Sequence, residues 1–82
     1  MTKSEIFEGI QYVFKEFLEI SSITPEIDII EDLQLDSVNL LTLIVELENY
    51  FQVSFEEGEE ENIRTINELI LLIEQSIQQQ YR

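Results

Sequence analysis

Cysteine and histidine are absent from this chain of 82 residues. Without cysteine the chain can form neither a disulfide nor a thiolate metal site. Because histidine is absent too, the side chains that most often act as general base, nucleophile or transition-metal ligand are missing. We therefore expect no catalytic residues and no metal site, and only carboxylate catalysis stays open. The chain is not expected to be an enzyme.

Long apolar runs are also lacking. The longest, residues 40–45 and 69–73, are far shorter than the roughly 20 apolar residues of a membrane-spanning helix. The N-terminal segment Met-Thr-Lys-Ser-Glu has no apolar core of the kind found in secretory signals. We expect a cytoplasmic protein without a membrane span.

Positive charge is scarce. Lys3, Lys15, Arg64 and Arg82 face 18 acidic residues, which gives a formal net charge of −14. Nothing basic lies in residues 16–63, which hold 14 of the acidic side chains. Such a surface repels nucleic acid and attracts basic partners. Since 44% of the residues are apolar, the chain is not an acidic disordered tail.

Apolar residues recur with helical spacing in three segments. Thr2 with Glu5 and Thr65 with Glu68 form capping-box patterns at the start of the first and last segments. The expected core stripes are Ile6, Ile10, Val13, Phe14, Phe17 and Leu18 in the first, Leu40, Leu43, Ile44, Leu47, Tyr50 and Phe51 in the second, and Ile66, Leu69, Ile70, Ile73 and Ile77 in the third.

The connections complete the expected fold. Residues 20–35 contain Pro25, which disfavours helix, yet stay apolar enough to lie across the helices. The acidic run 56–61 is interpreted as a solvated face, because it lacks the regular ligand spacing of a calcium loop; a weak divalent-cation site is the alternative. We predict one small all-α domain over residues 1–82, a four-helix bundle with three main helices and one short helix, at residues 3–19, 37–51, 57–62 and 66–79.

The segment around Ser37 has two open interpretations. Asp36 is a good N-cap for the second helix, so the Asp-Ser pair can be a helix start and no more. The Ser37 hydroxyl would also sit at the positive end of that helix, where a phosphate is favourably placed.

Three aliphatic side chains, Val38, Leu41 and Val45, lie between the core stripe and the polar stripe of the second helix. They form either an exposed contact surface or a surface covered by a neighbouring loop. Periodicity alone does not separate these alternatives.

The chain resembles the acyl carrier protein family over nearly its whole length. Asp36-Ser37-Val38 is similar to the family's Asp-Ser-Leu attachment motif, and residues 31–33, 46–51 and 63–66 resemble the family too. The resemblance implies that Ser37 carries 4′-phosphopantetheine, derived from coenzyme A, through a phosphodiester. The cofactor would supply the thiol that the chain lacks, and acyl groups would travel on it as thioesters.

The resemblance also implies partners and their contacts. These are a phosphopantetheinyl transferase and acyl-activating, ketosynthase or acyltransferase-type enzymes with basic docking patches. The implied partner-recognition residues are Asp36, Val38, Leu41, Val45, Glu48, Phe55 and Glu57. The implied acyl pocket comprises Ile29, Leu35, Leu43, Ile44, Leu47, Phe55 and Ile63, for which plain core packing is the alternative.

Departures from the family pattern bear on the pathway. Gln34 replaces a common glycine, and Asn39 and Thr42 stand where fatty-acid carriers are usually acidic. Phe55-Glu56 replaces Ile-Pro, and Val45 replaces a frequent methionine. We expect a stand-alone monomeric carrier of fatty-acid-like, polyketide or other specialised biosynthesis. The alternatives are an aminoacyl or peptidyl carrier, or an unmodified acidic helical binding module.

Overall fold

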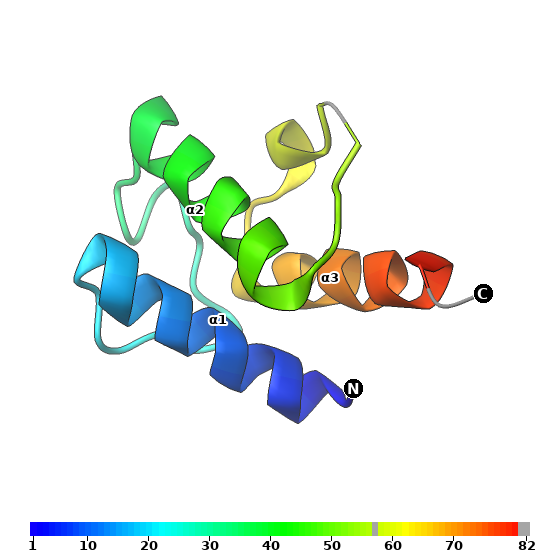
Figure 1. The fold of residues 1–82 in the computed structure, drawn as a ribbon. Coiled ribbons are helices and arrows are strands. Elements are labelled where there is room, and N and C mark those ends of the chain that lie inside the picture. The colour runs from blue at the N-terminus through cyan, green and yellow to red at the C-terminus, as the bar shows by residue number, and fades with distance from the viewer. Residues whose placement is uncertain (57, 81–82) are drawn as a thin grey trace.

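The computed structural model describes residues 1–56 and 58–80. Three α-helices, α1 (Lys3–Leu18), α2 (Ser37–Phe51) and α3 (Ile66–Gln80), surround one core, and a short 3-10 helix, η1 (Glu59–Asn62), precedes α3 (Figure 1). Within the described residues no strand forms, and the only β-type pairing is an isolated antiparallel bridge between Asp28 and Thr65. The predicted all-α class with three main helices is confirmed.

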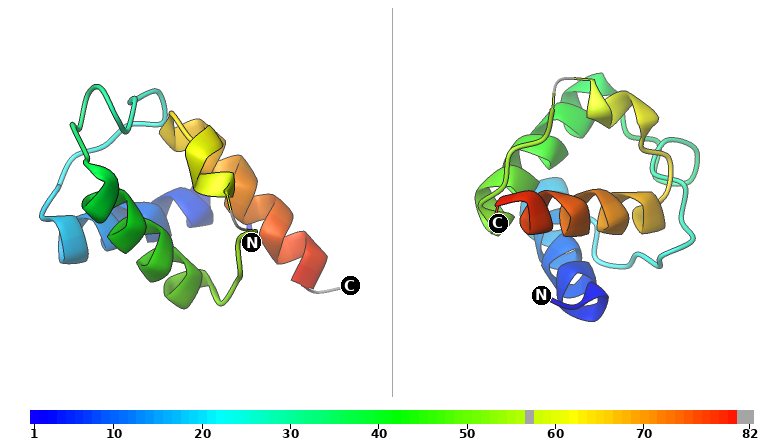
Figure 2. Two further views of the ribbon diagram at one scale, coloured as in Figure 1. Left: turned by 90° about the horizontal axis from the view of Figure 1, so that it is seen from above. Right: turned by 90° about the vertical axis from the view of Figure 1, so that its right-hand side faces the viewer.

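The predicted fourth helix is not confirmed as an α-helix. Its place is taken by η1, four residues long. The backbone N–H of Glu59 donates to the carbonyl of Glu56, and that of Glu61 donates to Gly58, at a spacing of three residues. Gly58 has a φ of 91°, which a glycine adopts easily and other residues do not. Residues 58–62 therefore make one tight turn ahead of α3 (Figure 2).

The helices begin where the sequence places caps. In α1 the Glu5 N–H donates to Thr2 Oγ1 at 3.1 Å, and the Thr2 N–H donates back to the Glu5 carboxylate at 2.8 Å. Thr65 and Glu68 make the same reciprocal pair before α3, at 3.2 and 2.9 Å. Both predicted capping boxes are confirmed, and each satisfies N–H groups that a helix start leaves free.

Two helices end on a residue other than glycine in the left-handed conformation. Glu19 ends α1 and Gln52 ends α2, with φ values of 58° and 57°. Both residues lie in the left-handed region, where a Cβ atom costs energy. The chain has only two glycines and places neither of them at a helix end.

The core lies between the three helices and beneath the long connection. The connection between α1 and α2 sends Ile23, Ile29 and Leu35 into it, as its apolar composition predicts. Gly9 faces α2 so closely that the rings of Tyr50 and Phe51 occupy the space of a side chain there. The remaining core residues come mainly from α1, α2 and α3, and include Ile6, Ile10, Val13, Phe14, Leu43, Leu47, Ile66, Leu69 and Ile73.

Two residues expected in the core stripes are on the surface. The side chains of Phe17 and Tyr50 are each 47% exposed. Phe17 is near the C-terminal end of α1, and Tyr50 lies beside Tyr12 of α1 with ring centroids 5.3 Å apart. The predicted placement of these two rings is wrong, because helical angle does not reveal where a neighbouring helix stops covering a face.

The long connection is fixed to the start of α3. Arg64 places its guanidinium 3.0 Å from the Asp28 carboxylate and 3.3 Å from that of Glu31. The Ile29 N–H donates to the Arg64 carbonyl at 2.6 Å. The Glu31 backbone N–H first of all, and then Arg64, lower the pKa of Asp28. These contacts hold the segment that leads into α2.

Candidate functional site

Ser37 is the first residue of α2, and its side chain is exposed. The Asp36 carboxylate caps the helix by accepting from the Asn39 N–H at 2.8 Å, as predicted. In Figure 1 this end of α2 lies on the side of the molecule away from the labelled chain termini. The hydroxyl is therefore presented to solvent on a well-anchored helix start.

The backbone before Ser37 is held by one buried anchor and one unusual turn. Leu35 is buried in the core, two residues before the serine. Gln34 has a φ of 53°, in the left-handed region. Glycine reaches this region without a Cβ penalty, so Gln34 adopts here a conformation that a glycine would adopt more easily.

The flanking aliphatic side chains of α2 are open to solvent. Val38 is 68% exposed, Leu41 56% and Val45 49%. The sequence left open whether a loop covers them, and no loop does so within the described part of the chain. They form an apolar strip, here called the α2 strip, that starts one residue after Ser37.

The remaining candidate recognition residues differ in their surroundings. Glu48 is half-buried, and its carboxylate accepts from the Phe55 N–H at 2.8 Å, so it fixes the segment after α2. Phe55 packs partly against the core. Glu57 lies outside the described residues. Both carboxylates thus accept a backbone hydrogen bond within the chain, Glu48 in a half-buried place and Asp36 in an exposed one.

The candidate acyl-pocket positions are packed. Six of the seven are buried and Phe55 is half-buried: Ile29, Leu35, Leu43, Ile44, Leu47, Phe55 and Ile63. Of these, Ile63 also lines a surface cavity of about 290 Å³, between η1 and α3. An acyl chain could enter among the others only if the helices moved apart.

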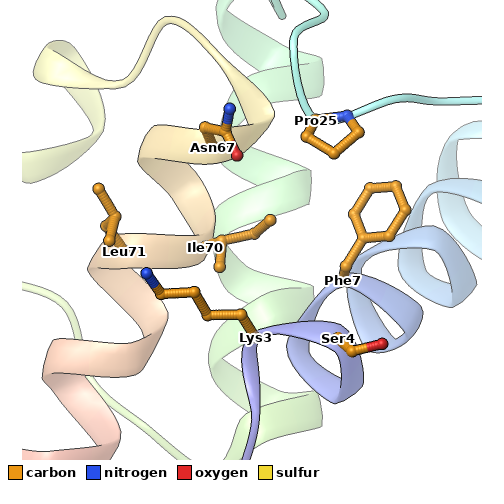
Figure 3. Close-up of a pocket in the computed structure, with 7 residues that line it drawn as sticks. All are labelled: Lys3, Ser4, Phe7, Pro25, Asn67, Ile70 and Leu71. Atoms are coloured by element: carbon orange, nitrogen blue, oxygen red, sulfur yellow. The ribbon is translucent and has the colours of Figure 1, made fainter.

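A larger cavity lies elsewhere, where the N-terminal turns of α1 and α3 meet the long connection (Figure 3). Its volume is about 350 Å³. Phe7, Pro25 and Ile70 form apolar walls, and Lys3 reaches across the opening. Ser37 does not line it.

Two kinds of structural feature are missing from the described residues. None of their helices is both long enough and apolar enough to cross a membrane. In the same part of the chain, no three acidic side chains come together in a group that could hold a metal ion.

Comparison with known proteins gives the family. A family model described as "Phosphopantetheine attachment site" matches residues 8–73, which include Ser37. The chain belongs to this phosphopantetheine-binding family of carrier proteins. An acyl carrier protein of Exiguobacterium sibiricum is 32% identical over 79 residues, which cover 94% of this chain and all of the relative.

Further relatives agree. An acyl carrier protein of Rubrobacter xylanophilus is 38% identical over 72 residues, covering 85% of this chain and 89% of the relative. A solved structure from Mycobacterium tuberculosis, assigned as an acyl carrier protein, superposes with a TM-score of 0.67 at 26% identity. It covers 88% of this chain and 93% of that one.

Family membership fixes the cofactor and the kind of protein. The cofactor is covalently attached 4′-phosphopantetheine, and the protein is an acyl carrier without catalytic activity of its own. Carriers of this family are modified by a phosphopantetheinyl transferase and serve biosynthetic enzymes.

The start of α2 fits the phosphate of this group. The first N–H groups of a helix have no partner inside the helix, and at α2 the Asp36 side chain satisfies that of Asn39. The N–H groups of Ser37 and Val38 donate to no group among the described residues. They and the helix dipole favour an anion at the exposed serine.

Proposed function

We propose that Ser37 is the residue that carries 4′-phosphopantetheine, and that the protein transports acyl groups for a dedicated biosynthetic pathway. The observation that carries this proposal is the exposed Ser37 hydroxyl at a helix N-terminus with unpaired N–H groups, inside the segment that matches the attachment family. When attached, the group supplies a thiol on which acyl groups are held as thioesters.

The neighbouring residues keep the site in place without taking part in bonds to the serine side chain. Asp36 holds the helix start through its bond to Asn39, so the Ser37 hydroxyl is not needed for folding. Leu35 anchors the preceding loop in the core. The attachment point is thereby anchored at the surface, and an arm joined to the exposed Ser37 hydroxyl would start in solvent.

Partner enzymes are proposed to dock on the α2 strip. Val38, Leu41 and Val45 provide apolar contact beside the arm, and the overall charge of −14 steers basic surfaces toward it. Because the attraction is electrostatic, association should be fast, weak and sensitive to salt.

The pathway is proposed to be a specialised one. Asn39 is neutral and exposed, and Thr42 is neutral with its hydroxyl bonded to the Val38 carbonyl at 3.1 Å. The outer face of α2 therefore carries less negative charge than the total charge suggests. This favours partners that recognise apolar contacts on α2 in addition to acidic ones.

The decisive experiment is modification of the apo protein by a broad-specificity phosphopantetheinyl transferase with coenzyme A, followed by intact mass and peptide mapping. We expect one phosphopantetheinyl group on Ser37. The Ser37→Ala variant should gain none and should unfold at nearly the wild-type temperature, because Asp36 still caps α2.

The same experiment identifies the alternatives. No gain of mass by the wild-type protein would remove the carrier assignment of Ser37 and favour an unmodified acidic binding module. Once the modified protein is in hand, loading is compared with acyl-activating and amino-acid-adenylating enzymes. Loading with an amino acid alone would replace the acyl assignment by an aminoacyl one.

A further inference from the structure

A second surface feature lies where α1 and α2 run side by side. Tyr12 and Phe17 of α1 and Glu46, Asn49 and Tyr50 of α2 line a shallow cavity of about 230 Å³, here called the aromatic pocket. Tyr12 is 50% exposed, and the other two rings are 47% exposed. A cluster of three half-exposed aromatic side chains beside a carboxylate is typical of an interaction surface.

Two of the three rings pack against a neighbouring ring. The centroids of Tyr12 and Tyr50 lie 5.3 Å apart with planes tilted by 37°. Tyr50 also packs edge-on against the buried ring of Phe51 at 4.9 Å. The rings of Tyr12 and Tyr50 therefore already lie side by side before any ligand arrives, which lowers the entropy cost of binding.

The chemistry of the lining selects a cation. Aromatic faces attract cations, and the carboxylate of Glu46 forms no ion pair with any of the described residues. The Asn49 side chain adds a carbonyl oxygen that can accept a hydrogen bond. A planar guanidinium suits this lining better than an ammonium, because it stacks on rings and donates in a fork to a carboxylate.

The pocket adjoins the α2 strip. Val45 and Asn49 are four residues apart on α2 and so lie on the same side of the helix, and Asn49 is also part of the pocket lining. A partner seated on Val45 would thus bring its flank over Tyr12 and Tyr50. Partners of a domain with charge −14 are expected to be basic there.

We propose that the aromatic pocket receives an arginine side chain of a partner protein and acts as a second anchor beside the α2 strip. The proposal extends the docking part of the proposed function. It assigns Glu46 to the guanidinium, the rings of Tyr12 and Tyr50 to stacking, and Phe17 to closing the far wall.

The test uses the intact apo protein and N-acetyl-arginine amide as the probe, followed by NMR of the aromatic side chains and the backbone. N-acetyl-lysine amide controls for charge, and N-acetyl-citrulline amide controls for shape without charge. We expect saturable shifts at Tyr12, Phe17, Tyr50, Glu46 and Asn49. Arginine should bind about two to five times more tightly than lysine, and citrulline should not bind.

Variants separate the pocket from the general negative charge. Glu46→Gln should weaken arginine binding about two- to fivefold. Glu26→Gln makes the same change in net charge at an exposed position in the long connection and should leave binding unchanged. Tyr12→Leu keeps apolar bulk but removes the aromatic face, and it should weaken binding to a similar extent, with circular dichroism confirming the fold.

Three results would overturn the proposal. The first is that arginine and lysine probes cause equal NMR shifts, spread over all acidic side chains. The second is that Glu46→Gln and Glu26→Gln weaken arginine binding equally, and the third is that the shifts at the pocket depend on protein concentration alone. The last would assign the pocket to self-association. None of these results affects modification of Ser37, so the carrier function is judged separately by its own experiment.

Discussion

Replacing Gly9 by alanine sets two known effects of opposite sign against each other. Alanine is favoured over glycine in a helix interior by about 1 kcal/mol, so propensity alone predicts a more stable protein. In the structure, however, a Cβ atom at Gly9 would lie 2.5 Å from Cζ of Phe51 and 2.6 Å from Cε1 of Tyr50. Both distances are far shorter than carbon atoms tolerate.

The two rings can yield to different extents. Tyr50 is half-exposed and can turn aside, whereas Phe51 is buried and can move only if α1 and α2 separate. Overpacking of a well-filled core costs about 1–3 kcal/mol. We therefore expect Gly9→Ala to lower the free energy of unfolding by about 1 kcal/mol after the propensity gain is subtracted. In a domain of this size that lowers the melting temperature by about 4–8 °C.

The assay is thermal and urea unfolding of four proteins in a double-mutant cycle. Phe51→Leu removes the ring atoms that meet the new methyl group, so the double variant should recover about 1–2 kcal/mol relative to the sum of the single effects. Gln11→Ala, at an exposed position in α1, controls for helix propensity and should change stability by less than about 0.5 kcal/mol. A Gly9→Ala protein that is more stable than wild type would refute the packing argument.

Three further outcomes follow from the fold. Gln52→Gly should raise the free energy of unfolding by about 0.5–1 kcal/mol, because this residue ends α2 at a φ of 57°, where glycine is favoured. A lower free energy of unfolding in urea would contradict this prediction. The lowered pKa of Asp28 stabilises the fold above the ordinary range of aspartate, about pH 4, and this contribution disappears as pH falls through the folded value. Arg64→Gln should raise the pKa of Asp28 without restoring it, because the Glu31 N–H bond remains, and a carboxyl NMR titration with no rise would refute the role of the ion pair. Raising the salt concentration from about 10 to about 150 mM shortens the screening length from about 30 to about 8 Å, which is less than any dimension of this 36 × 25 × 20 Å domain. Repulsion among the acidic side chains is then screened, so the melting temperature should rise. A melting temperature that does not change with salt would contradict self-repulsion.

The sequence by itself determined the helices and their starts. Apolar spacing of three and four residues has one interpretation in segments this long, and the cap pairs Thr2–Glu5 and Thr65–Glu68 act between near neighbours in the chain. The Asp36 cap before Ser37 is equally local. These features depend on residues within one helical turn, so no knowledge of the rest of the fold is needed to predict them.

Tertiary structure alone decided which side chains the helices leave uncovered. Val38 lies on α2 at an angle that fits either a covered or an open surface, and Tyr50 lies on the stripe expected to face the core, yet both side chains are exposed. The close contact of Gly9 with Phe51 joins residues 42 positions apart, and the ion pair of Arg64 with Asp28 joins residues 36 positions apart. Periodicity describes one helix at a time, whereas coverage depends on the distance and crossing of its neighbours, and those are set by packing of the whole core.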